Sequence, residues 1–209
     1  MKARITAALV VLALMGGVAR ADRPTARALM EEGDLHATAG DRDGALERYR
    51  KAIDADPDLL AAYDKAIPLW LDGKRWTEAA RYLERATVRN PGFAHAWYAL
   101  GYVYREERRF DAAIGAYQES TALQAGEAAP WFGLAAAYEG ARRVPDAVHA
   151  YRTYRRLERD PARAAFRRDA RAAIARLLGP PADVSDAVLR LVLDGGERAA
   201  WKQAAAMAK

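Results

Sequence analysis

A spacing of 34 residues recurs through most of this sequence. Alanine stands at four positions with this spacing, namely Ala45, Ala79, Ala113 and Ala147. Four residues after each alanine comes a large side chain, the set being Tyr49, Leu83, Tyr117 and Tyr151. A fixed period of this length is typical of a chain built from stacked helical or strand units, each of which contacts its neighbours. The spacing therefore predicts a repeat protein.

A second group of columns lies in the first half of each repeat. One column holds Leu29, Tyr63, Trp97 and Trp131, and another holds His36, Trp70, Tyr104 and Tyr138. In each repeat a short polar stretch, such as DGKRW, separates the two groups of columns. The apolar positions within each group recur three or four residues apart, which is the period of a helix. We expect two helices per repeat, joined by a polar turn.

These columns resemble the tetratricopeptide repeat (TPR) family, whose pattern is W-x2-L-G-x2-Y, then a spaced Ala, an aromatic, a second Ala and a Pro. The third repeat reproduces most of it through Trp97, Leu100, Gly101, Tyr104, Ala113 and Tyr117. It departs from the pattern at Ser120 and Ala125, where the family has a small residue and Pro. We place four units within residues 22–161, over 26–59, 60–93, 94–127 and 128–161.

The resemblance implies an all-α protein, a right-handed α-solenoid of about four TPR helical hairpins. Residues 162–178 follow the last unit, and they place Phe166, Ala170 and Ile174 on one helix face. We expect this segment to be a C-terminal capping helix. Residues 179–209 are predicted to form a short helical extension, which either packs on the array or forms a mobile tail.

Start signals for the second helices are visible in the polar turns. Asp43, Thr77 and Asp111 precede the alanine columns by two residues and are predicted as N-caps. The fourth repeat has Pro145 at this place, and Pro suits the first turn of a helix.

The N-terminal segment has the features of an export signal. Lys2 and Arg4 precede an apolar run from Ile5 to Val18, and Ala19-Arg20-Ala21 offers small residues for cleavage before Asp22. The run is shorter than the ~20 residues that span a bilayer, although a retained anchor is the alternative. We therefore predict that residues 1–21 are a cleaved signal peptide and that the protein is exported to a bacterial periplasm or secreted.

Composition narrows the possible functions. The formal net charge is +5, and removal of residues 1–21 would leave 30 basic against 28 acidic side chains. This near balance disfavours a nucleic-acid partner. The chain has no Cys, its three His have no metal-ligand spacing, and no nucleophile or phosphate-binding motif occurs. We expect no enzyme activity, no cofactor and no metal site.

The resemblance also implies a concave groove, lined by the first helices of the repeats, in which TPR domains hold peptides. The residues that we expect there are Met30, Asp64, His95, Tyr98, Tyr102, Arg105 and Phe132. Tyr98, Tyr102 and Phe132 would suit a hydrophobic peptide or helix. The alternative is that Tyr98 and Phe132 pack against neighbouring first helices. A carboxylate clamp of the kind found in some TPR domains is replaced by Met30, Asp34, Pro68 and His95.

Charge is unevenly distributed along the chain. Residues 22–72 carry 12 acids and 7 bases, whereas residues 141–171 carry ten Arg and four acids. The basic surface that we expect comprises Arg152, Arg155, Arg156, Arg159, Arg163 and Arg167. It is either a solvated helix face or a docking surface for an acidic protein, an anionic lipid head group or an anionic polymer.

The sequence thus predicts a non-catalytic, exported protein–protein interaction scaffold that binds a peptide or helix of an envelope partner in its groove. The alternative is a structural module that self-associates through the ends of the solenoid or through the Arg-rich 141–171 face. We expect no nucleic-acid partner and, at most, peripheral contact with a membrane.

Overall fold

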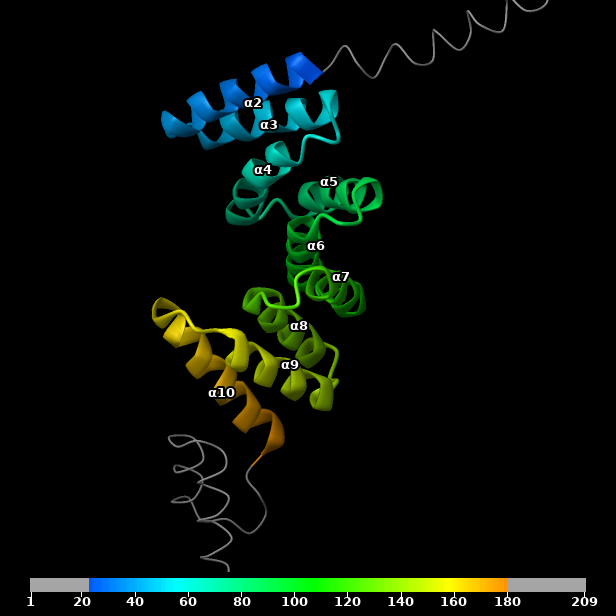
Figure 1. Ribbon diagram of the computed structural model, residues 1–209, viewed down its shortest axis with the longest axis vertical. Helices are drawn as coiled ribbons and strands as arrows, with labels where there is room; N and C mark the ends of the chain where they lie inside the picture. The colour runs from blue at the N-terminus through cyan, green and yellow to red at the C-terminus, as the bar shows by residue number, and fades with distance from the viewer. Residues whose placement is uncertain (1–22, 180–209) are drawn as a thin grey trace, which may run out of the picture. The chain divides into compact units, whose positions relative to one another are not determined.

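A computed structural model describes residues 23–179 of the chain (Figure 1). The predicted signal peptide, 1–21, and the extension after Gly179 lie outside the described residues. Within them, all regular structure is helical, so the all-α prediction is confirmed for this part of the chain. None of its helices is both long and apolar enough to span a bilayer.

The helices follow one another in pairs joined by short turns. The pairs are α2 (Arg23–Thr38) and α3 (Arg42–Ala55), α4 (Leu60–Asp72) and α5 (Trp76–Arg89), α6 (Ala94–Glu106) and α7 (Phe110–Leu123), and α8 (Ala128–Gly140) and α9 (Val144–Leu157). A 3-10 turn, Pro161–Arg163, then leads into α10 (Ala164–Leu178). The starts of α4, α6 and α8 are 34 residues apart, as the sequence period requires.

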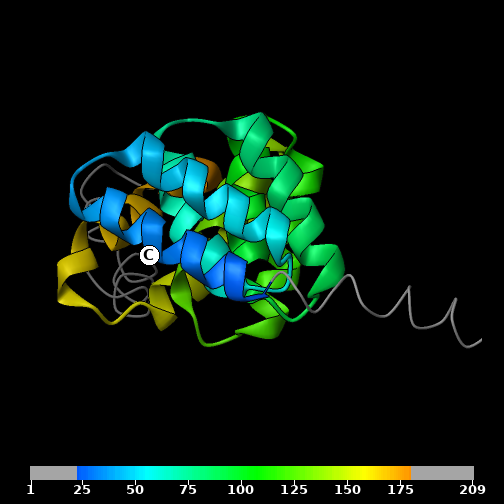
Figure 2. The ribbon, with the colours of Figure 1, turned by 90° about the horizontal axis from the view of Figure 1, so that it is seen from above.

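The described residues form two compact units, and the division between them falls between Val103 and Tyr104, inside α6. In the first unit α2 packs on α3, α3 on α4, and α4 on α5. Figures 1 and 2 both show α2 and α3 running side by side. In the second unit α7 packs on α8, α8 on α9, and α9 on α10. Packing between neighbours in sequence is what a repeat array requires.

The four alanines of the repeat are completely buried. Ala45, Ala79, Ala113 and Ala147 each have 0% exposed surface. The large residues four positions later, Tyr49, Leu83, Tyr117 and Tyr151, are also buried. A side chain no larger than a methyl group at the alanine position leaves room for a second helix at close range. The columns read from the sequence are therefore the packing positions of the second helices.

Two tryptophans of the first helices form hydrogen bonds with the loop that joins their repeat to the preceding one. The indole N–H of Trp97 donates to the carbonyl of Pro91 at 2.9 Å, and that of Trp131 donates to the carbonyl of Ala125 at 3.4 Å. Both tryptophans are only half-buried. Their rings thus pack at the helix surface while the N–H satisfies a carbonyl of the loop that precedes the helix.

The turn inside each repeat ends the first helix in the same way. The amides of Asp41, Arg75, Arg109 and Arg143 each donate to the carbonyl five residues earlier, at 2.8 to 2.9 Å. The residue before each of these amides is left-handed, namely Gly40, Lys74, Arg108 and Arg142, with φ between 52 and 78°. This is the Schellman arrangement, which usually takes glycine. Three of the four turns here are made without it.

The predicted N-caps Asp43, Thr77 and Asp111 are wrong by two residues. The N-cap positions of the second helices are instead Asp41, Arg75 and Arg109, and of these three only Asp41 accepts a backbone N–H of its helix through the side chain. Because the left-handed residue stops one helix abruptly, the next helix begins after a single residue. Asp43 and Asp111 consequently lie in the first turn, where their carboxylates favour the positive end of the helix dipole. Pro145 lies in the first turn of α9, as predicted.

The first repeat closes its turn with an acid rather than an arginine. Asp41 accepts the amide of Gly44 at 2.9 Å, and its other carboxylate oxygen lies 2.8 Å from Nδ1 of His36. The Gly44 amide, and then His36, lower the pKa of Asp41 below its usual range. In the third and fourth repeats Arg109 lies over the ring of Tyr104 and Arg143 over that of Tyr138. The last aromatic column of the first helix thus contacts the N-cap residue of the second helix in all three repeats. The contact is a hydrogen bond in the first repeat and a cation–π contact in the third and fourth.

Candidate functional site

The predicted groove residues all lie on first helices. Met30 is on α2, Asp64 on α4, His95, Tyr98, Tyr102 and Arg105 on α6, and Phe132 on α8. Arg105 and Phe132 belong to the second compact unit and the other five to the first. Asp64 and His95 are exposed, while the other five are half-buried.

A cluster on α4 and α6 brings three of these residues together. Nδ1 of His95 lies 2.6 Å from Oδ1 of Asp64, and the two side chains are 46% and 49% exposed. The His95 ring also stacks on Tyr98, with centroids 6.5 Å apart and planes 23° apart. A carboxylate, an imidazole and a phenol ring thus meet at the surface of neighbouring first helices. We call Asp64, His95 and Tyr98 the first-helix cluster.

The first-helix cluster has a counterpart one repeat earlier. Lys65 on α4 lies 2.8 Å from Oδ1 of Asp34 on α2, which also accepts the hydroxyl of Tyr49 at 2.8 Å. Burial opposes ionisation of Asp34, but the bonds from Lys65 and Tyr49 outweigh it, so its pKa is lowered. Both acid–base pairs join a first helix to the next first helix across 31 residues of sequence. Lys65 was not among the predicted site residues. The sequence does contain the signal for it, because Asp34 and Lys65 are 31 residues apart, as Asp64 and His95 are.

Tyr102 lies one turn after Tyr98 on α6. Its ring centroid is 6.0 Å from that of Trp76, the first residue of α5, and the planes are tilted by 54°. Both rings are half-buried. Trp76 did not enter the sequence-based site. Trp76 could have been found from the sequence, because it is an aromatic residue directly after a polar turn, where the second helix begins.

Phe132 is surrounded by aromatic rings of the second unit. Its centroid lies 5.6 Å from Tyr151, 5.0 Å from Tyr154 and 5.8 Å from Phe166, all edge to face. Tyr151 and Tyr154 are on α9, and Phe166 is on α10. The rings that contact Phe132 thus come from α9, a second helix, and from α10, whereas the alternative drawn from the sequence placed Phe132 against neighbouring first helices. Tyr154, large where the family has a small residue, supplies the nearest ring.

Arginines of α9 and α10 line two adjoining surface hollows. One hollow, of about 440 Å³, is lined by His149, Arg152, Thr153, Arg155 and Arg156. The other, of about 320 Å³, is lined by Arg155, Ala164, Arg167, Arg168 and Arg171. Of the predicted basic surface, Arg159 and Arg163 line neither hollow, and Arg163 lies 3.6 Å from Glu158. Arg168 and Arg171 were counted in the charge of this stretch but were not predicted to belong to the surface.

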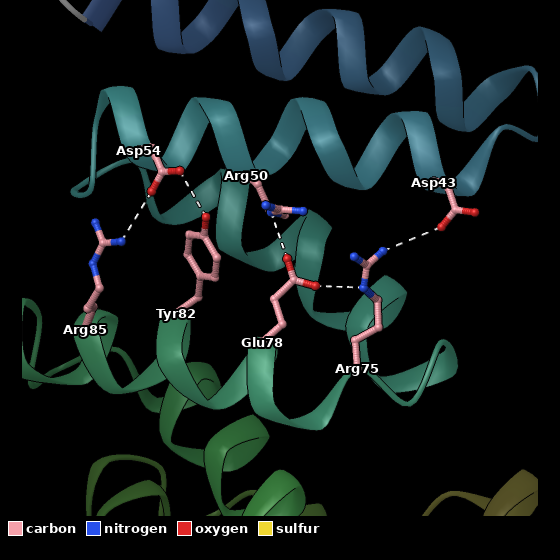
Figure 3. A network of polar contacts seen from close by, with 7 residues as sticks. All are labelled: Asp43, Arg50, Asp54, Arg75, Glu78, Tyr82 and Arg85. Atoms are coloured by element: carbon pink, nitrogen blue, oxygen red, sulfur yellow. Dashed lines mark hydrogen bonds and ion pairs between the residues drawn. The ribbon is translucent and has the colours of Figure 1, made fainter.

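Acids of the first unit are extensively paired with bases of the same unit. Figure 3 shows Glu78 on α5 between Arg50 of α3 and Arg75, at 2.8 and 2.7 Å. Asp54 of α3 receives the hydroxyl of Tyr82 at 3.0 Å and Arg85 at 3.3 Å. These contacts join α3 to α5, the second helices of the first two repeats. Asp54, which belongs to the acidic stretch 22–72, therefore contacts a neighbouring helix as well as solvent. The hollow beside them, of about 550 Å³, has both acids and bases in its lining.

The tetratricopeptide repeat family model matches residues 12–68 and 63–130, which together make up more than half of the chain. This protein belongs to the TPR family. A search of curated proteins found no match.

Several solved structures share the fold of this TPR protein. A crystal structure of MamA protein is 24% identical, with a TM-score of 0.65 over 85% of this chain and 87% of that one. MamA 41-end from Desulfovibrio magneticus RS-1 is 22% identical, with a TM-score of 0.56 over 63% and 75%. YrrB, described as a TPR protein with an unusual peptide-binding site, is 16% identical, with a TM-score of 0.61 over 88% and 98%.

Members of the TPR family are in general interaction modules without catalytic activity. Between residues 23 and 179, no group of three or more His, Asp or Glu side chains is arranged to hold a metal ion. The chemistry available on the first helices is that of recognition, through aromatic faces and partly exposed charged groups.

Proposed function

We propose that this TPR protein is a non-catalytic, exported scaffold that binds a peptide or helix of a protein partner in the cell envelope. The observation that carries the proposal is the first-helix cluster, in which His95 joins Asp64 to the ring of Tyr98 at the solvent-exposed surface. Membership of an interaction family supports it. The peptide-binding site of YrrB, a protein of similar fold, also supports it.

The first-helix cluster, together with Tyr102 one turn further along α6, offers two kinds of contact to a peptide. The rings of Tyr98 and Tyr102 supply apolar area at a low cost in rotamer entropy, because each side chain has few rotatable bonds. Asp64 and His95 are half exposed and supply hydrogen-bonding groups that orient the peptide backbone or a polar side chain. A segment with an apolar side chain beside a polar group fits this surface best.

Replacement of both tyrosines tests the site. We expect Tyr98→Ala with Tyr102→Ala to reduce capture of the partner from the envelope of the native host, with helicity unchanged by circular dichroism. Val88→Ala with Leu123→Ala is the matched control, because both residues are exposed apolar side chains on second helices. Equal capture by both variants would show that Tyr98 and Tyr102 do not bind the partner.

Export is proposed from the features of residues 1–21. A reporter fused to these residues should appear in the periplasm, and Leu12→Arg with Leu14→Arg in the apolar run should retain it in the cytoplasm. Unchanged export of the charged variant, or a cytoplasmic reporter in both cases, would contradict this part of the proposal.

Self-association is the second candidate function. Leu35 on α2 and Leu178 on α10 are 72% and 58% exposed, and each lies on a terminal helix of the described chain. Exposed apolar side chains at the ends of a repeat array provide surfaces for a further copy. Sedimentation over a range of concentrations tests this. A monomer throughout would exclude self-association, whereas a mass that rises with concentration would favour it.

A further inference from the structure

The two hollows on α9 and α10 form one continuous basic surface. Arg155 lines both, so the larger hollow, with Arg152 and Arg156, adjoins the smaller one, with Arg167 and Arg171. The two linings together contain His149 and six Arg, and neither contains an acidic side chain. This is unlike the hollow beside α3 and α5, whose lining mixes Asp43, Glu47 and Asp54 with basic residues.

Apart from His149, every basic side chain in the two linings is arginine. The chain has no lysine between Lys74 and Lys202. A guanidinium presents several N–H donors in one plane, and it can bind both oxygens of a carboxylate at once. It is also less strongly hydrated than an ammonium group, so it gives up water more readily at an interface. The surface is therefore suited to planar anions such as carboxylates.

The spacing of these arginines matches an extended polypeptide. Arg152 and Arg156 are four residues apart on α9, and Arg167 and Arg171 are four apart on α10. Four helical residues advance about 6 Å along the axis. In an extended chain, side chains on one face are about 6.6 Å apart, because alternate residues point the same way. Acids at every second position of a peptide would thus meet successive guanidinium groups.

We propose that the Arg155-centred surface binds an extended acidic segment of a partner protein, with Asp or Glu at alternate positions. The match between the arginine spacing and the side-chain spacing of an extended chain favours such a segment over a membrane, because lipid head groups in a fluid bilayer have no fixed spacing. The acids of the first unit are poor candidates for a countercharge from a second copy. Several of them, such as Asp54, Asp58 and Asp72, are each already bonded to an arginine of their own unit.

This surface is separate from the one in the proposed function. It lies on a second helix and the capping helix, whereas the first-helix cluster lies on α4 and α6. A protein with both surfaces could hold two different segments at once, which is what a scaffold does. Either proposal can be disproved without affecting the other, because the variants that test them share no residue.

The test uses fluorescence anisotropy with the full mature chain. The probe is a labelled peptide of alternating Glu and Ser, compared with a peptide of alternating Gln and Ser and with one that has all its Glu at one end. Arg156→Gln with Arg168→Gln removes one exposed guanidinium from each hollow. Lys74→Gln with Arg81→Gln removes the same charge from exposed positions on the first unit. Circular dichroism confirms that both variants are folded.

We expect the alternating Glu peptide to bind most tightly, and its dissociation constant to rise about tenfold in Arg156→Gln with Arg168→Gln, as two exposed ion pairs are lost. The control variant should bind as the natural chain does. Raising ionic strength from about 0.1 M to about 1 M should weaken binding, because the screening length shortens to ~3 Å.

Equal loss in both variants, or no preference among the peptides, would overturn the proposal. So would arginine-dependent binding to vesicles of anionic phospholipid without binding to the peptide.

Discussion

The carboxylate of Glu78 lies 2.8 Å from Nε of Arg50, and this contact joins α5 to α3 (Figure 3). The other carboxylate oxygen lies 2.7 Å from Nε of Arg75, which occupies the N-cap position of α5. Glu78 is only 16% exposed, so it is the least exposed member of these pairs. One carboxylate thus holds the second helices of the first two repeats in register.

Neutralising Glu78 should destabilise the first unit. We expect Glu78→Gln to lower the free energy of unfolding by about 1–2 kcal/mol, because two guanidinium groups lose a partly buried partner. Asp43→Asn is the control, since Asp43 is 97% exposed and lies 3.6 Å from Arg75. It should change stability by less than about 0.5 kcal/mol. Urea unfolding followed by circular dichroism measures both, and equal effects would contradict the role given to Glu78.

A large side chain in the alanine column should be poorly tolerated. We expect Ala113→Trp to cost about 1–3 kcal/mol of stability through overpacking, because Ala113 has no exposed surface. Ala122→Trp, at an exposed position on the same helix, should leave the melting temperature nearly unchanged. Thermal melts of the two variants give the comparison. A melt of Ala113→Trp equal to that of the natural protein would show that the second helices do not cross at this column.

The turns that end the first helices suggest a stabilising substitution. Lys74 adopts φ of 52°, a conformation that costs an L-residue about 1 kcal/mol and glycine almost nothing. We therefore expect Lys74→Gly to be neutral or to raise stability by up to ~1 kcal/mol. Arg81→Gly, in the interior of α5, should lower stability by about 1 kcal/mol. Denaturant unfolding distinguishes the two, and a clear loss with Lys74→Gly would contradict the assigned turn.

Two buried tyrosines predict how stability changes at alkaline pH. Burial and then the hydrogen bond to Asp34 raise the pKa of Tyr49 to about 12, while burial and Glu139 raise the pKa of Tyr151 to about 12. In the unfolded chain both titrate near pH ~10. Because the folded pKa is the higher one, their contribution to stability is complete below pH ~10 and is lost as the pH rises through about 12.

Unfolding free energies measured between pH ~9 and ~12 test this expectation. The natural chain should lose stability steeply above pH ~10, and Tyr49→Phe with Tyr151→Phe should lose less over the same range. Absorbance of the phenolate reports ionisation directly. Titration of both tyrosines near pH ~10 in the folded protein would contradict the burial argument.

The sequence period predicted the helical hairpins and their packing columns because burial repeats with the fold. Ala113 and Tyr117 are buried for the same reason as their counterparts in every other repeat. The caps were misplaced because the left-handed turn residue is Lys or Arg in three repeats, and these residues carry no turn signal of their own. Asp43, preceding a helical pattern, looked more like a cap than Arg75 or Arg109 did.

The candidate site was predictable only in part. The repeat register predicted that Asp64, His95 and Tyr98 lie on first helices. Their contacts depend on side-chain rotamers and on the spacing of neighbouring helices, which a linear pattern does not contain. Phe132 shows this most clearly, because its partners Tyr154 and Phe166 depend on how the capping helix meets α9.

The proposed function requires the first-helix cluster of this TPR protein, together with Tyr102, to bind a segment of another protein. Photo-crosslinking in the native host tests it most directly, with a benzophenone amino acid placed at Tyr98 or, as the control, at exposed Val88 on a second helix. We expect a discrete crosslinked partner from position 98 that is missing from position 88. The same products from both positions, or no product from position 98, would contradict the account.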